Sequence, residues 1–200
     1  MDHVETIREF VKARGDAAVI FGPSKNSGVL YNEEHQPATI YNMELGYPTA
    51  IALGLALATP EQRVVAIEGD GSMIAGIGVL STIARHAPAN LVILLLDNCT
   101  YGSIGAGDAE SATAAGLNLA DVARASGLLP EKVVQSDDLD SLRSQLSVAM
   151  TEPGPWMICA KTERYSTQII QNPPLPDQDV VESAVFFRRE MMARGYVRKD

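Results

Sequence analysis

Apolar residues recur along this chain in two alternating patterns. Short continuous apolar runs predict buried strands, and these runs cover residues 17–21, 39–42, 63–68, 90–96 and 155–161. Longer segments with apolar residues at helical spacing, or with many small residues, predict helices over residues 6–14, 47–59, 72–86, 119–126 and 139–150. Because strands and helices alternate throughout, we expect an α/β fold with a doubly wound parallel sheet flanked by helices.

The pattern changes in the last fifth of the chain. Residues 171–176 (Gln-Asn-Pro-Pro-Leu-Pro) predict an extended linker, and residues 177–194 resume as one helix. We therefore expect a domain over residues 1–165 and a C-terminal linker and extension helix over residues 166–200. A helix beyond such a linker is expected to lie at an interface and to cover a partner subunit rather than to complete the core of its own domain.

Two polar motifs follow two consecutive predicted strands. Gly69-Asp70-Gly71-Ser72 comes after one strand, and Asp97-Asn98 comes after the next. Because the carboxyl ends of parallel strands meet at one edge of a sheet, Asp70 and Asn98 are expected to lie close together. Their oxygens are the hard ligands that Mg²⁺ or Ca²⁺ prefers, and the bare glycine turn lets backbone N–H groups approach a phosphate. The motifs therefore predict a divalent metal that holds a diphosphate.

Each of these residues also has a plainer interpretation. Asp70 has the residue type of a turn or helix-capping aspartate, and Asn98 that of a turn asparagine. Ser72 is expected to cap the helix that follows it. The spacing of the two motifs favours the metal interpretation over the plainer one.

Composition excludes several classes of function. A length of 200 residues suits one domain with a sizeable core, and a net charge of −9 argues against a nucleic-acid partner. Cys99 and Cys159 are the only two cysteines, which suggests a reducing compartment. No signal peptide is readable at the N-terminus, and the uncharged run at residues 91–96 is far too short to cross a membrane. We expect a cytoplasmic protein with no membrane partner.

The two motifs and their spacing resemble the thiamine diphosphate motif of 2-oxoacid decarboxylases and acetolactate synthase-like enzymes. The resemblance extends over residues 46–105. This segment is similar to the branch of the family with small, split subunits, which includes the β subunit of sulfopyruvate decarboxylase and its relative phosphonopyruvate decarboxylase. The matching stretches are residues 51–58, 69–72, 80–83, 96–98 and 101–103. The resemblance implies the thiamine diphosphate-binding fold, with thiamine diphosphate and Mg²⁺ as cofactors.

The resemblance also implies a set of ligands for the metal and the diphosphate. Asp70, Asn98 and the backbone carbonyl of Thr100 would hold Mg²⁺, although the family commonly has glycine at the position of Thr100. The residues implied in binding the cofactor are Ser24, Met43, Leu45, Gly69, Gly71, Ser72, Met73, Asn98 and Tyr101. Within this set, Ser72 and the N–H of Met73 would hold the diphosphate, and Ser24 would contribute from a loop that resembles the family's first phosphate loop only loosely.

Met43 and Leu45 are the catalytic candidates that the resemblance implies. Thiamine chemistry needs a bent cofactor, and Leu45 would be the apolar wedge between its two rings. The Met43 carbonyl would accept from the 4′-amino group of the pyrimidine. Met43 and Glu44 both depart from the small residues that are usual there, and the alternative for Leu45 is an ordinary core leucine.

The glutamate that activates the cofactor belongs to a pyrimidine-binding domain in the resembled enzymes, and nothing in this chain resembles that domain. The resemblance therefore implies the diphosphate-binding subunit of a heteromeric 2-oxoacid decarboxylase, completed by a pyrimidine-domain subunit. Its substrate would be a small 2-oxo acid with a second anionic group. The alternatives are a carboligating synthase-type subunit, an oxidoreductase or transketolase-like β component, and a non-catalytic cofactor-binding partner.

Overall fold

A six-stranded parallel sheet forms the centre of the computed structural model, which describes residues 1–102, 109–164 and 174–196. The strands are β1 (Ala18–Phe21), β2 (Thr39–Ile40), β3 (Val64–Gly69), β4 (Leu91–Asp97), β5 (Val133–Ser136) and β6 (Trp156–Lys161). Their order in the sheet is β2-β1-β3-β4-β6-β5, and every neighbouring pair is parallel. The predicted doubly wound α/β fold is confirmed.

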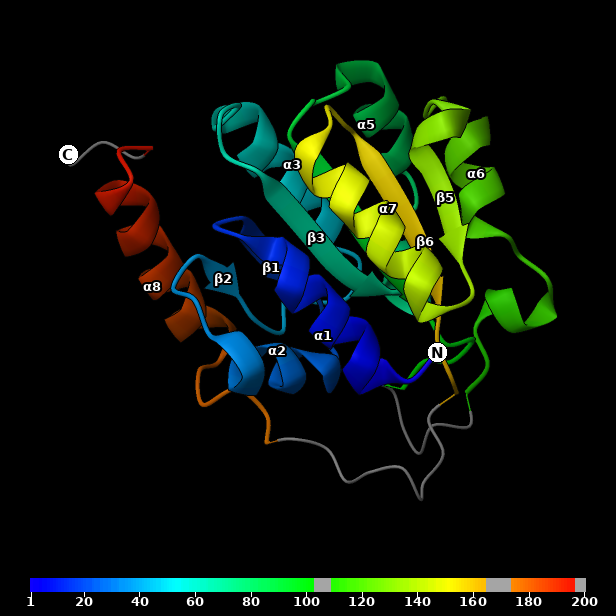
Figure 1. Cartoon of the computed structure of the whole chain (residues 1–200), viewed down its shortest axis with the longest axis horizontal. Coiled ribbons are helices and arrows are strands. Elements are labelled where there is room, and N and C mark those ends of the chain that lie inside the picture. The colour runs from blue at the N-terminus through cyan, green and yellow to red at the C-terminus, as the bar shows by residue number, and fades with distance from the viewer. Residues whose placement is uncertain (103–108, 165–173, 197–200) are drawn as a thin grey trace.

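Helices cover both faces of this sheet (Figure 1). The helices are α1 (His3–Arg14), α2 (Asn26–Glu34), α3 (Pro48–Ala58), α4 (Asp70–Ala75), α5 (Val79–His86), α6 (Leu119–Ala125), α7 (Leu139–Thr151) and α8 (Val180–Ala193), with short 3₁₀ turns at Ala112–Ala115 and Pro130–Lys132. Side chains of β3 alternate between two cores: Val65 and Ile67 pack with α1 and α7, and Val64 and Ala66 pack with α3, α5 and α6. This two-sided burial explains why the central strands read as continuous apolar runs.

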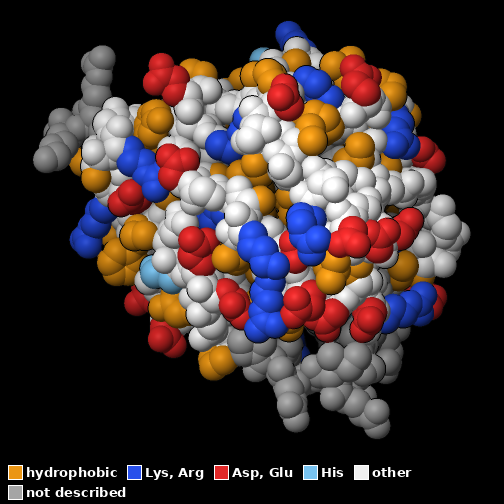
Figure 2. Space-filling model, viewed as in Figure 1, with side chains coloured by type: hydrophobic (Ala, Val, Ile, Leu, Met, Phe, Trp, Pro, Cys, Tyr) orange, Lys and Arg blue, Asp and Glu red, His pale blue; other side chains and the backbone are white. Residues whose placement is uncertain are grey.

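The face covered by α1 and α7 is charged and mixed in sign. Figure 2 shows Lys and Arg side chains lying among Asp and Glu on this face. The Glu9 carboxylate of α1, for example, pairs with Lys12 at 2.7 Å and with Arg143 of α7 at 2.9 Å. No helix in the described part of the chain is long and apolar enough to span a membrane.

Two elements, α2 and β5, were not predicted from the sequence. Helix α2 begins with the polar residues Asn26 and Ser27, and both are buried although polarity alone indicates a loop. Strand β5 is only four residues long at the edge of the sheet, and Gln135 within it is exposed. Both segments owe their structure to tertiary contacts that no local periodicity reports.

The helix expected over residues 72–86 is two helices, α4 and α5. Helix α4 begins at Asp70 with Gly69 as its N-terminal cap, so the prediction that Ser72 caps this helix is wrong. The break follows Gly76, where an added Cβ would lie 2.3 Å from the carbonyl oxygen of Gly46. At this break between the two helices, the backbone of Gly76 packs directly against the backbone of Gly46.

Helix α8 lies beside β2 at the edge of the sheet (Figure 1). The Ser183 hydroxyl oxygen accepts a hydrogen bond from the Tyr41 N–H at 3.2 Å, and Phe187 and Met191 are buried in the core on the α3 side. The expectation that this helix does not complete the core is therefore wrong for its inner face. Its outer face includes Val181, which is 66% exposed, and an interfacial role for that face stays a prediction.

Candidate functional site

The polar motifs meet at the carboxyl edge of the sheet. In the pairing of β3 with β4, Gly69 lies opposite Leu96, so the residues that follow them emerge side by side. The loop after β1 and the loop after β2 reach the same edge, because Met43 N donates to the carbonyl oxygen of Phe21 at 2.8 Å. This is the end of a parallel sheet where ligands bind in doubly wound folds.

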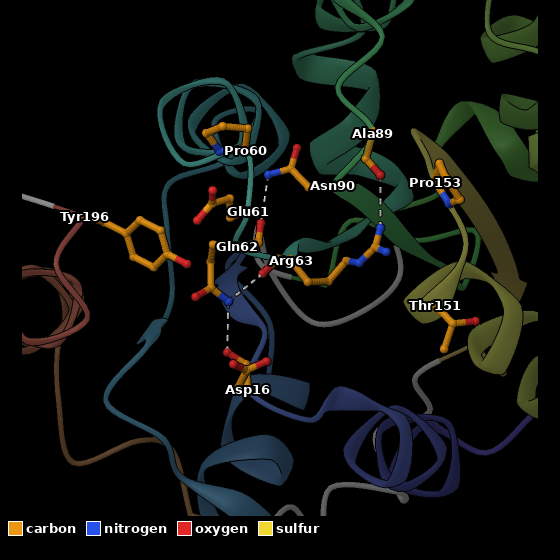
Figure 3. A pocket seen from close by; sticks show the side chains of 10 residues that line it. All are labelled: Asp16, Pro60, Glu61, Gln62, Arg63, Ala89, Asn90, Thr151, Pro153 and Tyr196. Atoms are coloured by element: carbon orange, nitrogen blue, oxygen red, sulfur yellow. Dashed lines mark hydrogen bonds between the residues drawn. The ribbon is translucent and has the colours of Figure 1, made fainter.

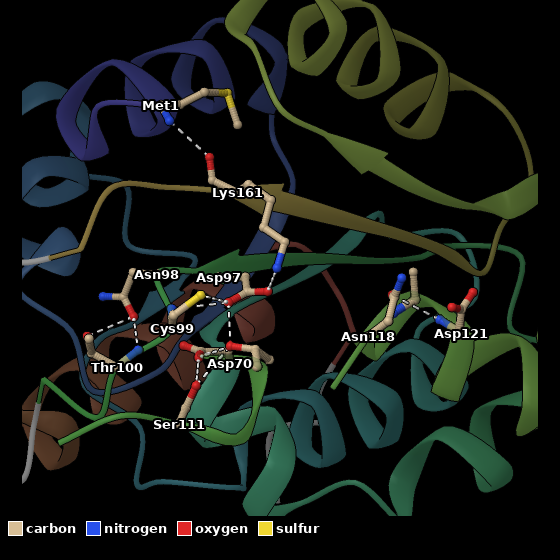
Figure 4. A network of polar contacts seen from close by, with 12 residues as sticks. Met1, Asp70, Asp97, Asn98, Cys99, Thr100, Ser111, Asn118, Asp121 and Lys161 are labelled. Carbon is tan, nitrogen blue, oxygen red and sulfur yellow. Dashed lines mark hydrogen bonds and ion pairs between the residues drawn. The ribbon is translucent and has the colours of Figure 1, made fainter. Parts of the chain in front are cut away.

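Asp70 is almost completely buried at this edge, with 1% of its surface exposed. Its Oδ2 accepts hydrogen bonds from the hydroxyls of Ser111 and Thr113, the latter at 2.9 Å (Figure 4). Its Oδ1 is buried with no hydrogen-bond partner among the described residues. Burial raises the pKa of Asp70, and the nearby charge of Asp97 raises it further against the effect of the two hydroxyls. An unpaired buried carboxylate oxygen is costly, and a bound cation would satisfy it.

Asp97 extends this polar network toward β6. The Thr113 hydroxyl lies 2.8 Å from Asp97 Oδ1, and Lys161 forms an ion pair with Asp97 Oδ2. Thr113 has one hydroxyl proton, so it can donate to Asp70 or to Asp97 but not to both at once. Lys161 neutralises only one of the two carboxylates. The residues present therefore fit a divalent cation at Asp70 Oδ1.

The described residues contain no group of three His, Cys, Asp or Glu side chains placed to hold a metal. A cation at Asp70 would thus need amide, backbone or phosphate oxygens as its remaining ligands, which is the set that Mg²⁺ accepts. Asn98 is buried close by, and its Oδ1 accepts from both the N–H and the hydroxyl of Thr100 at 3.0 Å. Coordination by Asn98 would replace the contact with the Thr100 hydroxyl. The roles of Asn98 and Thr100 as ligands stay predictions.

Ser111 and Thr113 were not identified from the sequence. Their segment is placed by an antiparallel bridge between Thr100 and Glu110, and by a hydrogen bond from Ser111 N to the Cys99 carbonyl oxygen at 3.1 Å. The only signal in the sequence is a group of small hydroxyl residues after the Asn98 motif. Such residues are common in loops, so the pattern alone does not distinguish them.

The glycine turn at residues 69–72 is closely covered. An added Cβ on Gly71 would lie 2.4 Å from the ring of Tyr101, which places that predicted cofactor residue directly over the turn. Ser72 donates its hydroxyl proton to Glu68 Oε2 and accepts from Gly46 N at 3.0 Å. The Ser72 hydroxyl is thus engaged inside the protein, while the Met73 side chain is buried in the core.

The remaining predicted residues surround the same edge. Ser24 Oγ accepts from Asn26 N at 3.1 Å at the start of α2. Leu45 is 37% exposed, so it is not a core leucine of this chain, and its role as the wedge stays a prediction. Residues 103–105, at the end of the stretch that carries the resemblance, lie outside the described residues.

Glu68 is a buried carboxylate that no motif in the sequence indicated. Only 2% of its surface is exposed, and it accepts hydrogen bonds from the hydroxyls of Thr49 and Ser72. Burial raises its pKa, against the effect of the hydrogen bonds from Ser72 and Thr49. No cation pairs with Glu68 among the described residues.

A separate cavity of about 420 Å³ opens at the amino ends of the strands (Figure 3). Arg63 lines it, but its guanidinium donates to the carbonyl oxygens of Ala89 at 3.1 Å and Glu152 at 3.3 Å. Gln62 donates to the carbonyl oxygen of Asp16 at 3.0 Å. These donors already stabilise the loops around the cavity, and we assign no ligand to it.

Comparison with known proteins shows which family the domain resembles. The family model described as thiamine pyrophosphate enzyme, C-terminal TPP binding domain, matches residues 28–160. The chain is 30% identical to the sulfopyruvate decarboxylase subunit beta of Methanocaldococcus jannaschii over 179 residues, which cover 86% of this chain and 90% of that protein. It is 35% identical to the phosphonopyruvate decarboxylase of Streptomyces viridochromogenes over 144 residues, which cover 72% of this chain but only 35% of that protein.

Solved structures agree on the fold. The thiamine diphosphate-dependent 4-hydroxybenzoylformate decarboxylase of Rhodococcus jostii matches with a TM-score of 0.66 and 21% identity, over 82% of this chain and 33% of that one. A protein isolated from Mycobacterium smegmatis and described as a putative thiamin diphosphate-dependent enzyme matches with a TM-score of 0.64 and 22% identity, over 80% of this chain and 32% of that one. The chain therefore spans about a third of these larger enzymes.

Proposed function

This chain belongs to the thiamine pyrophosphate enzyme family, and we propose that it is the diphosphate-binding subunit of a heteromeric thiamine diphosphate- and Mg²⁺-dependent 2-oxoacid decarboxylase. The observation that carries the proposal is Asp70, whose buried Oδ1 at the carboxyl edge of the sheet has no hydrogen-bond partner among the described residues. The names of the relatives, a decarboxylase subunit and a decarboxylase, support the reaction class.

Asp70 Oδ1, the Asn98 carboxamide and the Thr100 carbonyl would hold Mg²⁺ at this edge. Ser111 and Thr113 would orient the Asp70 carboxylate through its other oxygen. Mg²⁺ would in turn hold the diphosphate of the cofactor at this edge of the sheet.

The other predicted cofactor residues would contact different parts of the cofactor. Ser72, the N–H of Met73 and Ser24 would hold the diphosphate, which the bare turn at Gly69 and Gly71 lets approach closely. Met43 and Leu45 would bind and orient the organic part, and Tyr101 is the remaining predicted cofactor residue. When bound, thiamine diphosphate supplies an electron sink for the bond pair released as carbon dioxide leaves a 2-oxo acid. Exposure of Leu45 in this chain leaves its side chain available to support the bent cofactor.

The second wall of the site would come from a partner. The relative named subunit beta implies a heteromeric assembly, and the activating glutamate would belong to a pyrimidine-domain subunit. The substrate would be a small 2-oxo acid with a second anionic group, the class to which the substrates named in the two relatives belong.

The test is cofactor binding by the complex of this chain with a co-expressed pyrimidine-domain subunit. Asp70→Asn removes the charge with almost no change in shape, and we expect it to abolish Mg²⁺-dependent binding of thiamine diphosphate in calorimetric titrations. Asp140→Asn is the control, because Asp140 lies on the surface of α7 in an exposed pair with Arg143. Unchanged affinity in Asp70→Asn would refute the metal assignment.

Activity tests the need for a partner. Carbon dioxide release should be measured against a panel of 2-oxo acids, with and without the second subunit. We expect turnover only by the complex. Turnover by this chain alone would contradict the proposal that it forms one wall of a shared site.

A further inference from the structure

Glu68 lies beneath three segments that border the proposed site. It is the last residue but one of β3, the strand that leads into the glycine turn. Its carboxylate accepts from Thr49 at the start of α3 and from Ser72 in α4. An added Cβ on Gly22, in the loop after β1, would lie 3.2 Å from the Cβ of Glu68. One buried side chain therefore links the first turns of α3 and α4 and lies close to the loop after β1.

The hydrogen bonds at Glu68 have a fixed direction. A carboxylate only accepts, so Ser72 must donate its single hydroxyl proton to Glu68. Its oxygen is then free to accept from Gly46 N, at 3.0 Å. Glu68 thereby determines the orientation of a hydroxyl that anchors the backbone immediately after Leu45.

The backbone around Gly46 has little room to move once this anchor is made. Gly46 has a φ of +84°, a conformation that favours glycine, and an added Cβ would lie 3.3 Å from the backbone of Ala75 and Gly76. Tyr47 N donates to the Glu44 carbonyl oxygen at 3.1 Å and continues the turn into α3. The segment from Met43 to Tyr47 is thus fixed at its end by backbone packing and by the Glu68–Ser72 pair.

We propose that Glu68 is a positioning residue, which through Ser72 and Thr49 holds the Met43–Tyr47 loop in the geometry that receives the pyrimidine ring of the cofactor. This inference rests on the proposed function and adds a residue to it. Glu68 itself lies beneath the loop and touches no reacting atom. Its effect is on the backbone of Met43 and Leu45, for which a displacement of about 1 Å is enough to lower the rate about 100-fold.

Replacement of a carboxylate with a purely structural role is expected to have a different effect. Glu9 is also buried, but it lies between α1 and α7 on the opposite face of the sheet and pairs with Lys12 and Arg143. Its removal should lower the free energy of unfolding without any local effect on the Met43–Tyr47 loop. Glu9→Gln is therefore the matched control for Glu68→Gln.

The experiment compares Glu68→Gln with Glu9→Gln in the complex, by hydrogen exchange and by titration with thiamine diphosphate and Mg²⁺. Glutamine at position 68 keeps one acceptor oxygen and carries an NH₂ donor in place of the other, so Thr49 and Ser72 can no longer both donate to it. We expect amide exchange at Gly46 to rise about tenfold, the equivalent of one hydrogen bond to a charged group, and cofactor affinity to fall by a similar factor. Amides of β3 and β4 should keep their protection.

A second variant covers the case in which Glu68→Gln does not fold. Thr49→Val removes the other hydroxyl donor to Glu68 at nearly constant volume, and Thr49 is not among the predicted cofactor residues. We expect the same local rise in exchange, of smaller size, together with a weaker affinity for the cofactor.

The outcomes separate this proposal from the proposed function. Variants at Glu68 and Thr49 that lower only global stability, as Glu9→Gln does, would overturn the positioning role. If the wild-type complex binds no thiamine diphosphate, the proposed function fails, while the exchange at Gly46 still decides whether Glu68 controls the loop. Faster exchange at Gly46 with unchanged cofactor affinity would also overturn the positioning role.

Discussion

The close approach of the Gly76 and Gly46 backbones allows a direct test of whether this contact holds the Met43–Tyr47 loop of the proposed site in position. An added Cβ on Gly76 would lie 2.3 Å from the Gly46 carbonyl oxygen and 3.1 Å from its carbonyl carbon. Gly78 lies two residues further on, and an added Cβ there would meet nothing within 4 Å. Gly76→Ala and Gly78→Ala therefore add the same methyl group, in a crowded position at residue 76 and in open space at residue 78.

The magnitude follows from this distance. Real Cβ atoms essentially never approach another heavy atom more closely than 3.0 Å, so the Gly46 backbone must move by at least the difference, 0.7 Å. The atom that must move belongs to the backbone and cannot rotate away. Overpacking of this kind costs about 1–3 kcal/mol of stability. Gly78→Ala should be neutral or stabilising by up to about 1 kcal/mol, because alanine reduces the entropy of the unfolded chain.

The assay is urea denaturation of both variants, followed by thiamine diphosphate titration of their complexes with the second subunit. We expect Gly76→Ala to lose stability and also to bind the cofactor less tightly, because the displaced carbonyl adjoins Leu45. Gly78→Ala should match the wild type in affinity. Equal stability and equal affinity of the two variants would refute the argument that this backbone contact positions the loop.

Three further changes test other parts of the structure. The hydrogen bonds from Arg143 and then Lys12 lower the pKa of Glu9 from 4.5 to about 2, so Glu9→Gln should cost about 1–2 kcal/mol at pH 7, and in urea titrations this difference should shrink as the pH falls from 4.5 toward 2. Phe187→Ala should cost about 2–4 kcal/mol by denaturant unfolding because Phe187 is buried, whereas Phe186→Ala, at an exposed position, should change stability by at most about 0.5 kcal/mol. Thr113→Val should weaken Mg²⁺ binding about 10–100-fold in titrations of the complex, and an unchanged affinity would contradict the orienting role of its hydroxyl.

Much of the fold could be predicted because its central strands are apolar on both sides. The runs before Asp70 and Asn98 identified β3 and β4 within one residue at either end. Strand β5 and helix α2 were missed because their residues are buried by neighbours rather than by their own periodicity. Local pattern alone cannot report such burial.

In the candidate site, too, some features could be predicted from local sequence patterns and others depend on tertiary contacts. The spacing of Asp70 and Asn98 predicted that both would lie at the carboxyl edge of the sheet, and both are buried there. Ser111 and Thr113 lie 41 and 43 residues after Asp70, and their segment is placed by the antiparallel bridge between Thr100 and Glu110, so no local pattern predicted their contacts with Asp70.

The sequence by itself determined the alternation of strands and helices and the two polar motifs at the strand ends. These features are local, because burial on both faces requires apolar runs and a close backbone turn requires glycine. Only the tertiary structure decided that the inner face of α8 joins the core and that Ser72 faces Glu68. It also decided that Asp70 Oδ1 meets no hydrogen-bond partner in the part of the chain that the structure describes. Those outcomes depend on which residues, far apart in the chain, are brought together when the sheet and its covering layers form.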